Sequence, residues 1–184
     1  MNGGYHLAHP AQLSVGPGMN APGRSGPRVR IVVPSFQQGR FLRPCLESLL
    51  HQRYHGLEVV VVDNLSFDET ESVLRDFGPR LTRVIREADN GQTHALLKGF
   101  GEGDAEILGW LNVDDMLMPD AVQRVVRAFS ETGADVVSGH CSALDGRGQF
   151  QGYMASRVRP RPGLALHLAD VIPQPACFFS RAAY

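Results

Sequence analysis

The stretch Leu57-Glu58-Val59-Val60-Val61-Val62-Asp63 decides the fold of this chain. Its four consecutive valines are β-branched and apolar, so they favour a strand that is buried on both faces. Strands of this kind belong to parallel sheets, whose two faces are covered by helices. The stretch therefore predicts an α/β protein, and Asp63 marks the point where the strand ends.

Strands and helices alternate on both sides of this stretch, which predicts a mainly parallel sheet between helices. We expect further strands at 29–34, 81–85, 107–111, 134–138 and 177–179. We expect helices at 41–50, 68–77 and 93–100, a helix that begins at Pro119, a loop or hairpin around 145–148 and a short helix at 164–168. The buried side of the helix after Pro119 should carry Ala121, Val122, Val125, Val126 and Phe129.

Composition bounds the class of protein. The chain has 184 residues, 18 Lys+Arg and 19 Asp+Glu, so its formal net charge of 18 − 19 = −1 argues against a general nucleic-acid binder. Three cysteines without a C-x-x-C pair argue against a disulfide scaffold or a zinc ribbon. Neither a transmembrane run nor a signal peptide is visible. Residues 1–27, with six Gly and four Pro, predict a flexible leader, and residues 28–184 predict one domain.

Polar side chains follow four of the predicted strands. Ligands of open α/β sheets bind at the carboxyl ends of the strands, so we expect these side chains to converge on one site. The candidates are Pro34, Ser35 and Phe36 after the first strand, Asp63 after the second, Glu87, Asp89, Asn90, Gly91 and Gln92 after the third, and Asn112, Asp114 and Asp115 after the fourth.

Asp114 and Asp115 are the strongest candidates, because two adjacent carboxylates repel each other unless a cation compensates them. Mg²⁺ or Mn²⁺ typically takes one or two protein carboxylates and fills its shell with water and phosphate oxygens. The pair therefore predicts a metal site for a diphosphate. The alternative is that one of the two carboxylates only caps a turn before the next helix.

Three other candidates each have a structural alternative. Asp63 either binds a nucleobase or ribose, or forms a local turn. Phe36 either stacks on a base or packs in the core. Lys98, the only lysine, either approaches a phosphate near the helix N-terminus at Gly91 or is a solvated surface cation.

Five segments, in this order, resemble the family 2 inverting glycosyltransferases of the GT-A fold. They are Ile31-Val32-Val33-Pro34-Ser35-Phe36, Val61-Val62-Asp63-Asn64-Leu65-Ser66-Phe67-Asp68-Glu69-Thr70, Asp89-Asn90-Gly91-Gln92, Gly109-Trp110-Leu111-Asn112-Val113-Asp114-Asp115 and Ile172-Pro173-Gln174-Pro175-Ala176-Cys177-Phe178-Phe179-Ser180-Arg181. The resemblance implies an α/β/α domain that takes a nucleotide-diphospho-sugar and transfers the sugar with inversion, with Mn²⁺ or Mg²⁺ as cofactor.

The resemblance also implies residue roles. Asp114 and Asp115 match the metal-binding D-x-D-type element, and Asp115 is the better metal ligand. The nucleotide-sugar site would comprise Pro34, Ser35, Phe36, Asp63, Asp89, Gly91, Gln92, Lys98, Asn112 and Asp114. The second segment departs from the family, which more often has Gly-Gly or Gly-Ser where Asn64-Leu65 stand here.

In the family, the general base usually follows the Phe-Phe-x-Arg strand by some twenty or more residues. We therefore expect the base beyond Tyr184, and the chain to represent the donor half of a longer domain; Asp145 and Asp170 are poor substitutes. The alternative function is a non-catalytic module that binds a nucleotide-sugar or a partner. A Rossmann dehydrogenase, a P-loop protein and a nucleotidyltransferase are excluded, because no Gly-rich phosphate loop follows the first strand. The resemblance implies a saccharide or lipid-linked acceptor, a role in cell-envelope polysaccharide synthesis and a cytoplasmic location, at most peripheral to the inner face of the membrane.

Overall fold

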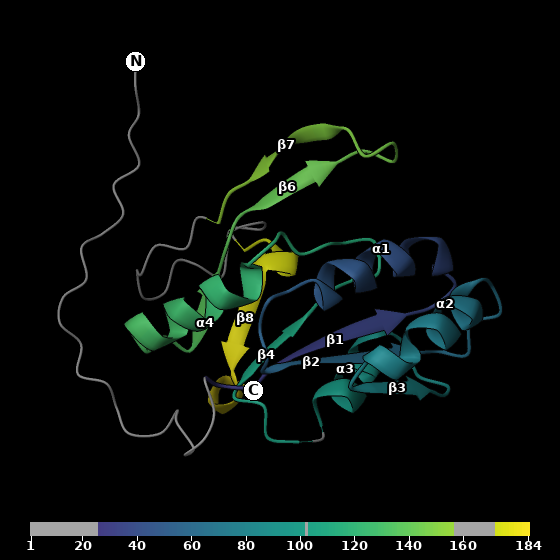
Figure 1. The fold of residues 1–184 in the computed structure, drawn as a ribbon, viewed down its shortest axis with the longest axis horizontal. Coiled ribbons are helices and arrows are strands. Elements are labelled where there is room, and N and C mark those ends of the chain that lie inside the picture. Colours follow the sequence, from purple (N-terminus) through teal and green to yellow (C-terminus); the bar gives the residue numbers. More distant parts are fainter. Residues whose placement is uncertain (1–25, 102, 157–171) are drawn as a thin grey trace.

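The computed structural model describes residues 26–101, 103–156 and 172–184 (Figure 1). Its elements follow the predicted alternation of strands and helices. They are β1 (Val29–Ser35), α1 (Gly39–Leu50), β2 (Leu57–Asp63), α2 (Thr70–Phe77), η1 (Gly78–Arg80), β3 (Arg83–Arg86), α3 (Gln92–Phe100), β4 (Ile107–Trp110), α4 (Ala121–Thr132), β5 (Val136–Ser138), β6 (Cys141–Leu144), β7 (Phe150–Met154), η3 (Gln174–Ala176), β8 (Cys177–Ser180) and η4 (Arg181–Ala183). The predicted strand 81–85 begins later, at Arg83, because Leu81 still closes the 3-10 turn η1, with its backbone N–H bonded to the Gly78 carbonyl at 3.0 Å.

The main sheet has six strands in the order β3-β2-β1-β4-β8-β5. The first four are mutually parallel, as predicted, and Val33 of β1 pairs with Val61 of β2. Strand β8 lies antiparallel between β4 and β5, which the order of elements along the sequence did not predict. The result is a mixed, mostly parallel sheet with helices on both faces, so the predicted fold class is confirmed.

The central strand β1 divides the core into two layers. Val29, Ile31 and Val33 face one layer, in which α1, α2 and α4 pack, whereas Val32 faces the layer formed with α3. Alternate side chains of one strand point to opposite faces, so a strand with valines at both odd and even positions supplies both layers. All four of these β1 side chains are at most 1% exposed.

Helix α4 is less deeply buried than its sequence pattern predicted. Val122 and Phe129 are buried, but Val125 and Val126 are only partly covered and Ala121 is half-buried. The reason is the helix's position near the edge of the sheet, where the neighbouring strand β5 has only three residues.

The β6–β7 hairpin stands apart from the main sheet in Figure 1, and of the predicted loop or hairpin around 145–148 it is the hairpin that forms. Its turn is held by Asp145, whose carboxylate accepts a hydrogen bond from the backbone N–H of Arg147 at 2.8 Å. Most of the predicted leader, 1–27, and the predicted helix at 164–168 lie outside the described residues. Within the described ranges, no helix is long and apolar enough to cross a membrane.

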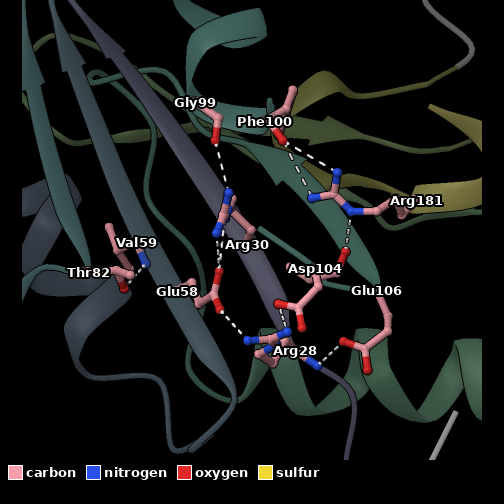
Figure 2. Close-up of polar contacts among 11 residues, drawn as sticks. Arg28, Arg30, Glu58, Val59, Thr82, Gly99, Phe100, Asp104, Glu106 and Arg181 are labelled. Carbon is pink, nitrogen blue, oxygen red and sulfur yellow. Dashed lines mark hydrogen bonds and ion pairs between the residues drawn. The ribbon is translucent and has the colours of Figure 1, made fainter. Parts of the chain in front are cut away.

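Figure 2 shows ionic contacts at the edge where the parallel strands begin. Glu58 at the start of β2 accepts hydrogen bonds from Arg30, the shorter at 2.7 Å, and also lies 3.7 Å from Arg28. Arg28 pairs with Asp104 as well, and its backbone N–H donates to Glu106 at 2.7 Å. These contacts join β1, β2 and the segment before β4, so they pin together the edge of the sheet opposite the carboxyl ends.

Candidate functional site

The loops after β1 and β2 are tied together through Asp63 and Ser66. Asp63 is 0% exposed, and its carboxylate accepts hydrogen bonds from the Ser66 backbone N–H at 3.0 Å, from the Ser66 hydroxyl, and from Arg86 Nε at 3.2 Å. The Ser66 hydroxyl oxygen in turn accepts a hydrogen bond from the backbone N–H of Gln37 at 2.9 Å. Gln37 and Leu65 both have a positive φ, at 55° and 54°, which these bonds help to hold.

Asp63 therefore has a structural task in these loops, as its turn-forming alternative proposed. Its predicted contact with a base stays a prediction, since the carboxylate is covered. Phe36, by contrast, is 55% exposed and is not a core residue. Of the other two candidates of this loop, Pro34 is half-buried and Ser35 is buried, with a hydroxyl that has no hydrogen-bond partner among the described residues.

The loop after β3 leads into the N-terminus of α3. The Asp89 carboxylate accepts a hydrogen bond from the backbone N–H of Gly91 at 2.8 Å. Gly91 has φ +99°, and a Cβ built on it would meet nothing within 4 Å, so this helix N-terminus faces open space. The N-terminus of an α-helix favours anions, because its backbone N–H groups are unpaired and the helix dipole is positive there.

Lys98 lies in the last turn of α3, and its ammonium is already engaged. It donates to the Ala88 carbonyl at 2.7 Å and forms an ion pair with Glu87 at 3.0 Å. The predicted role of Lys98 beside a diphosphate therefore stays a prediction, and it requires the ammonium to exchange partners. The alternative of a freely solvated cation does not describe this structure either.

Asp114 and Asp115 lie on the loop that follows β4. Burial and the neighbouring Asp114 carboxylate raise the pKa of Asp115 to about 6, and a hydrogen bond from Asn112 opposes this effect. Beneath the loop, the Cys45 thiol donates to the Asn112 backbone carbonyl at 3.6 Å. Burial, followed by the charges of Asp115 and Asp114, raises the pKa of Cys45 to about 12, so this thiol stays protonated.

A row of three side-chain amides connects this loop to two other elements. Gln92 of α3 donates to Asn112 Oδ1 at 2.6 Å, and Asn112 donates to Gln174 Oε1 at 2.9 Å. Gln174, in η3, donates in turn to the Trp110 backbone carbonyl at 2.9 Å. The structure thus brings Gln92 and Asn112 together, as predicted for one site. Our sequence reasoning assigned no role to Gln174, whose signal was a polar residue between Pro173 and Pro175 just before a strand.

The carboxylate pair suits a hard divalent cation. Mg²⁺ and Mn²⁺ prefer oxygen ligands, and within the described part of the chain neither Asp114 nor Asp115 forms an ion pair with a basic side chain. The described part of the chain contains no group of three or more His, Cys, Asp or Glu side chains that could hold a metal ion. Among the described residues this pair is the candidate ligand set, and water and ligand phosphates would complete the shell.

Comparison with known proteins gives a family. The model of the family described as glycosyl transferase family 2 matches residues 30–174. An uncharacterized glycosyltransferase of Nostoc sp., alr2836, is 27% identical over 150 residues, which cover 80% of this chain and 46% of that protein. Glycosyltransferase GlyG of Streptococcus pneumoniae is 26% identical, over 70% of this chain and 44% of its own length. The chain thus spans less than half of either relative.

Solved structures agree with the fold. The mannosyltransferase PcManGT of Pyrobaculum calidifontis, determined with GDP-Man and Mn²⁺, superposes with a TM-score of 0.56 at 28% identity, over 61% of this chain and 35% of that one. TarS of S. aureus superposes with a TM-score of 0.66 at 19% identity, over 83% of this chain and 47% of that one. The GT-A-like architecture implied by the sequence resemblance is therefore confirmed.

Proposed function

Because the chain belongs to glycosyl transferase family 2, we propose that it binds a nucleotide-diphospho-sugar and transfers the sugar to an acceptor hydroxyl with inversion, assisted by Mn²⁺ or Mg²⁺. The observation that carries the proposal is the Asp114-Asp115 pair. The pair follows the parallel strand β4 in the chain and is linked through Asn112 and Gln92 to the open N-terminus of α3. One place thus combines a carboxylate pair for a cation with a helix end for an anion.

Each part of the proposed site would act on a different part of the donor. Asp115, with Asp114, would hold the cation, which when bound offsets the negative charge of the departing diphosphate. The backbone at Gly91 would face the diphosphate, with Asp89 fixing the turn before it. Phe36, exposed beside the tied loops, would stack on the base. Pro34, Ser35 and Asp63 would shape the base pocket, and Lys98 would lie at its phosphate side.

The transfer itself is a displacement at the anomeric carbon. The acceptor oxygen forms a bond to that carbon while the bond to the diphosphate oxygen breaks. The nucleoside diphosphate leaves on the opposite face, and a carboxylate base takes the hydroxyl proton. We assign no described residue as this base. Residues 28–184 would form the donor domain, the acceptor would be saccharide or lipid-linked, and the site of action would be the cytoplasmic side of the membrane.

Two solved neighbours support a nucleotide-sugar as the ligand. PcManGT was crystallised with GDP-Man and Mn²⁺, and one TarS structure holds UDP-GlcNAc. Their bases and sugars differ, so these two neighbours leave the base and the sugar of the present donor open. A panel of nucleotides is therefore the appropriate probe.

Calorimetric titration of the purified chain with UDP, GDP and dTDP, with and without Mn²⁺, tests the donor site. We expect one nucleotide to bind at least tenfold more tightly with Mn²⁺, and Asp115→Ala to abolish this difference. Asp76→Ala is the matched control, because it removes a 56% exposed aspartate of α2. Metal-dependent affinity that survives Asp115→Ala would refute the metal assignment, and a folded chain that binds none of the three would refute the donor site. Binding without sugar transfer would favour the non-catalytic alternative.

A further inference from the structure

The row Gln92–Asn112–Gln174 has a chemical direction. Each side-chain amide has a donor end, the NH₂ group, and an acceptor end, the oxygen. Each amide donates toward the Trp110 end of the row: Gln92 donates to Asn112, Asn112 donates to Gln174, and Gln174 donates to the Trp110 backbone carbonyl. Three bonds of 2.6–2.9 Å therefore run with one polarity.

The Trp110 carbonyl sets this polarity, because a backbone carbonyl only accepts hydrogen bonds. Gln174 must turn its NH₂ group toward that carbonyl, which leaves its oxygen for Asn112. Asn112 must then turn its own NH₂ group toward Gln174, and its oxygen is left for Gln92. Reversing any one amide would place two donors or two acceptors against each other.

Gln174 is mounted more rigidly than the other two amides. It lies in η3 between Pro173 and Pro175, whose rings restrict the backbone on both sides. Pro173 is buried, and the Ala176 backbone N–H bonds back to its carbonyl at 3.1 Å. Strand β8 follows at once and is paired with β4 and β5. The fixed end of the row is therefore on the sheet, and the variable end is Gln92, which is exposed.

We infer that Gln174 is a positioning residue for the donor site: it orients Asn112 and, through it, Gln92, so that the Gln92 side-chain oxygen faces the ligand as an acceptor for a hydroxyl group. Within the described ranges this oxygen accepts no hydrogen bond, while the NH₂ group of Gln92 is bound to Asn112. The inference rests on the proposed function, because it assigns a hydroxyl-bearing ligand to the same site.

The hydroxyl could belong to the ribose or to the transferred sugar, and paired ligands separate these sources. Titrations of UDP against UDP-GlcNAc, and of GDP against GDP-mannose, with Mn²⁺ present, are compared between wild type and Gln174→Met. Methionine has a similar length but neither donates nor accepts in this row. A five- to tenfold loss shared by both members of a pair indicates the ribose, and one confined to the nucleotide-sugar indicates the sugar; about this size follows from one lost hydrogen bond.

Gln123→Met is the matched control, because Gln123 also donates its side-chain amide to a backbone carbonyl, that of Arg53, and is not a member of the row. We expect it to cost similar thermal stability and to leave both affinities unchanged. A second readout needs no ligand. In ¹⁵N spectra of the free protein, Gln174→Met should shift the side-chain NH₂ signals of Gln92, which lies two hydrogen bonds away along the row.

The outcomes are distinguishable. Unmoved Gln92 signals, or unchanged affinities in a folded Gln174→Met protein, would overturn the positioning role while the donor site stands. If the wild type binds none of the four ligands, the proposed function fails together with the assignment of the hydroxyl, and the spectra still decide whether Gln174 orients Gln92.

Discussion

Replacing Asp63 should destabilise the protein and loosen the loops that would hold the nucleotide. In Asp63→Ala the buried backbone N–H and hydroxyl of Ser66 lose their acceptor, at about 1–2 kcal/mol each. Arg86 loses one partner but is 36% exposed and keeps Glu71 at 3.3 Å and the Ser66 carbonyl, so it adds little. We expect a total loss of about 3 kcal/mol in the free energy of unfolding.

Asp63→Asn should cost less, about 1–2 kcal/mol, because its remaining oxygen can still accept from the Ser66 backbone while the charge is lost. For a chain of this size each kcal/mol lowers the melting temperature by roughly 2–4 °C, so Asp63→Ala should melt roughly 6–12 °C lower. Urea unfolding and calorimetric melting measure both quantities. Asp76→Asn, on the exposed face of α2, is the control and should stay within about 0.5 kcal/mol of wild type.

The same variants separate a structural from a base-reading Asp63. Because Ser66 also holds the backbone of Gln37, loosening this loop should weaken every nucleotide of the panel by a similar factor, and Ser66→Ala should do so too. If the Asp63 carboxylate instead binds a base directly, Asp63→Ala should weaken the binding of one nucleotide selectively, and Ser66→Ala should leave all affinities unchanged. That second pattern, or Asp63→Ala with wild-type stability, would refute the structural role.

Two further outcomes follow from the described contacts. Gly99→Ala should lower the free energy of unfolding by about 1–3 kcal/mol in urea titrations, because the added Cβ would meet a Val32 methyl group in the core, and this cost exceeds the helix propensity of alanine. Gly78→Ala is the matched control, because a Cβ there would meet nothing within 4 Å. Equal stabilities of the two variants would contradict the packing argument. Burial opposes ionisation of Asp68, but hydrogen bonds from Thr70 and Gly39 outweigh it and lower its pKa below the ordinary 3.8, so its stabilising contribution is present above that pH and lost as the pH falls through the lowered value. The stability difference between wild type and Asp68→Asn should therefore shrink in melts below pH 3.8, and a constant difference would show that the carboxylate does not titrate with folding.

Much of the fold follows from local patterns along the chain. The valine-rich strand 57–62 predicted a parallel sheet buried on both faces, and the strand-end positions of Asn112, Asp114 and Asp115 predicted a site at the carboxyl edge. The fold inference succeeds because the hydrophobic period is a property of neighbouring residues, whereas the site at this edge stays a prediction. Local patterns also explain why the family resemblance could be carried by short segments in a fixed order.

Only the tertiary structure decided which partners the polar side chains take. Asp63 lies under a loop tied by Ser66, and Lys98 reaches back to Glu87, because contacts between residues distant in sequence depend on how the layers pack. The insertion of β8 between β4 and β5 also depends on packing between distant residues, and it brings Gln174 to Asn112, 62 residues apart in sequence. Sequence therefore determined the alternation of elements and the edge that holds the polar groups. The antiparallel placement of β8 brought Gln174 to Asn112, because hydrogen-bond partners depend on where each donor and acceptor finally lies.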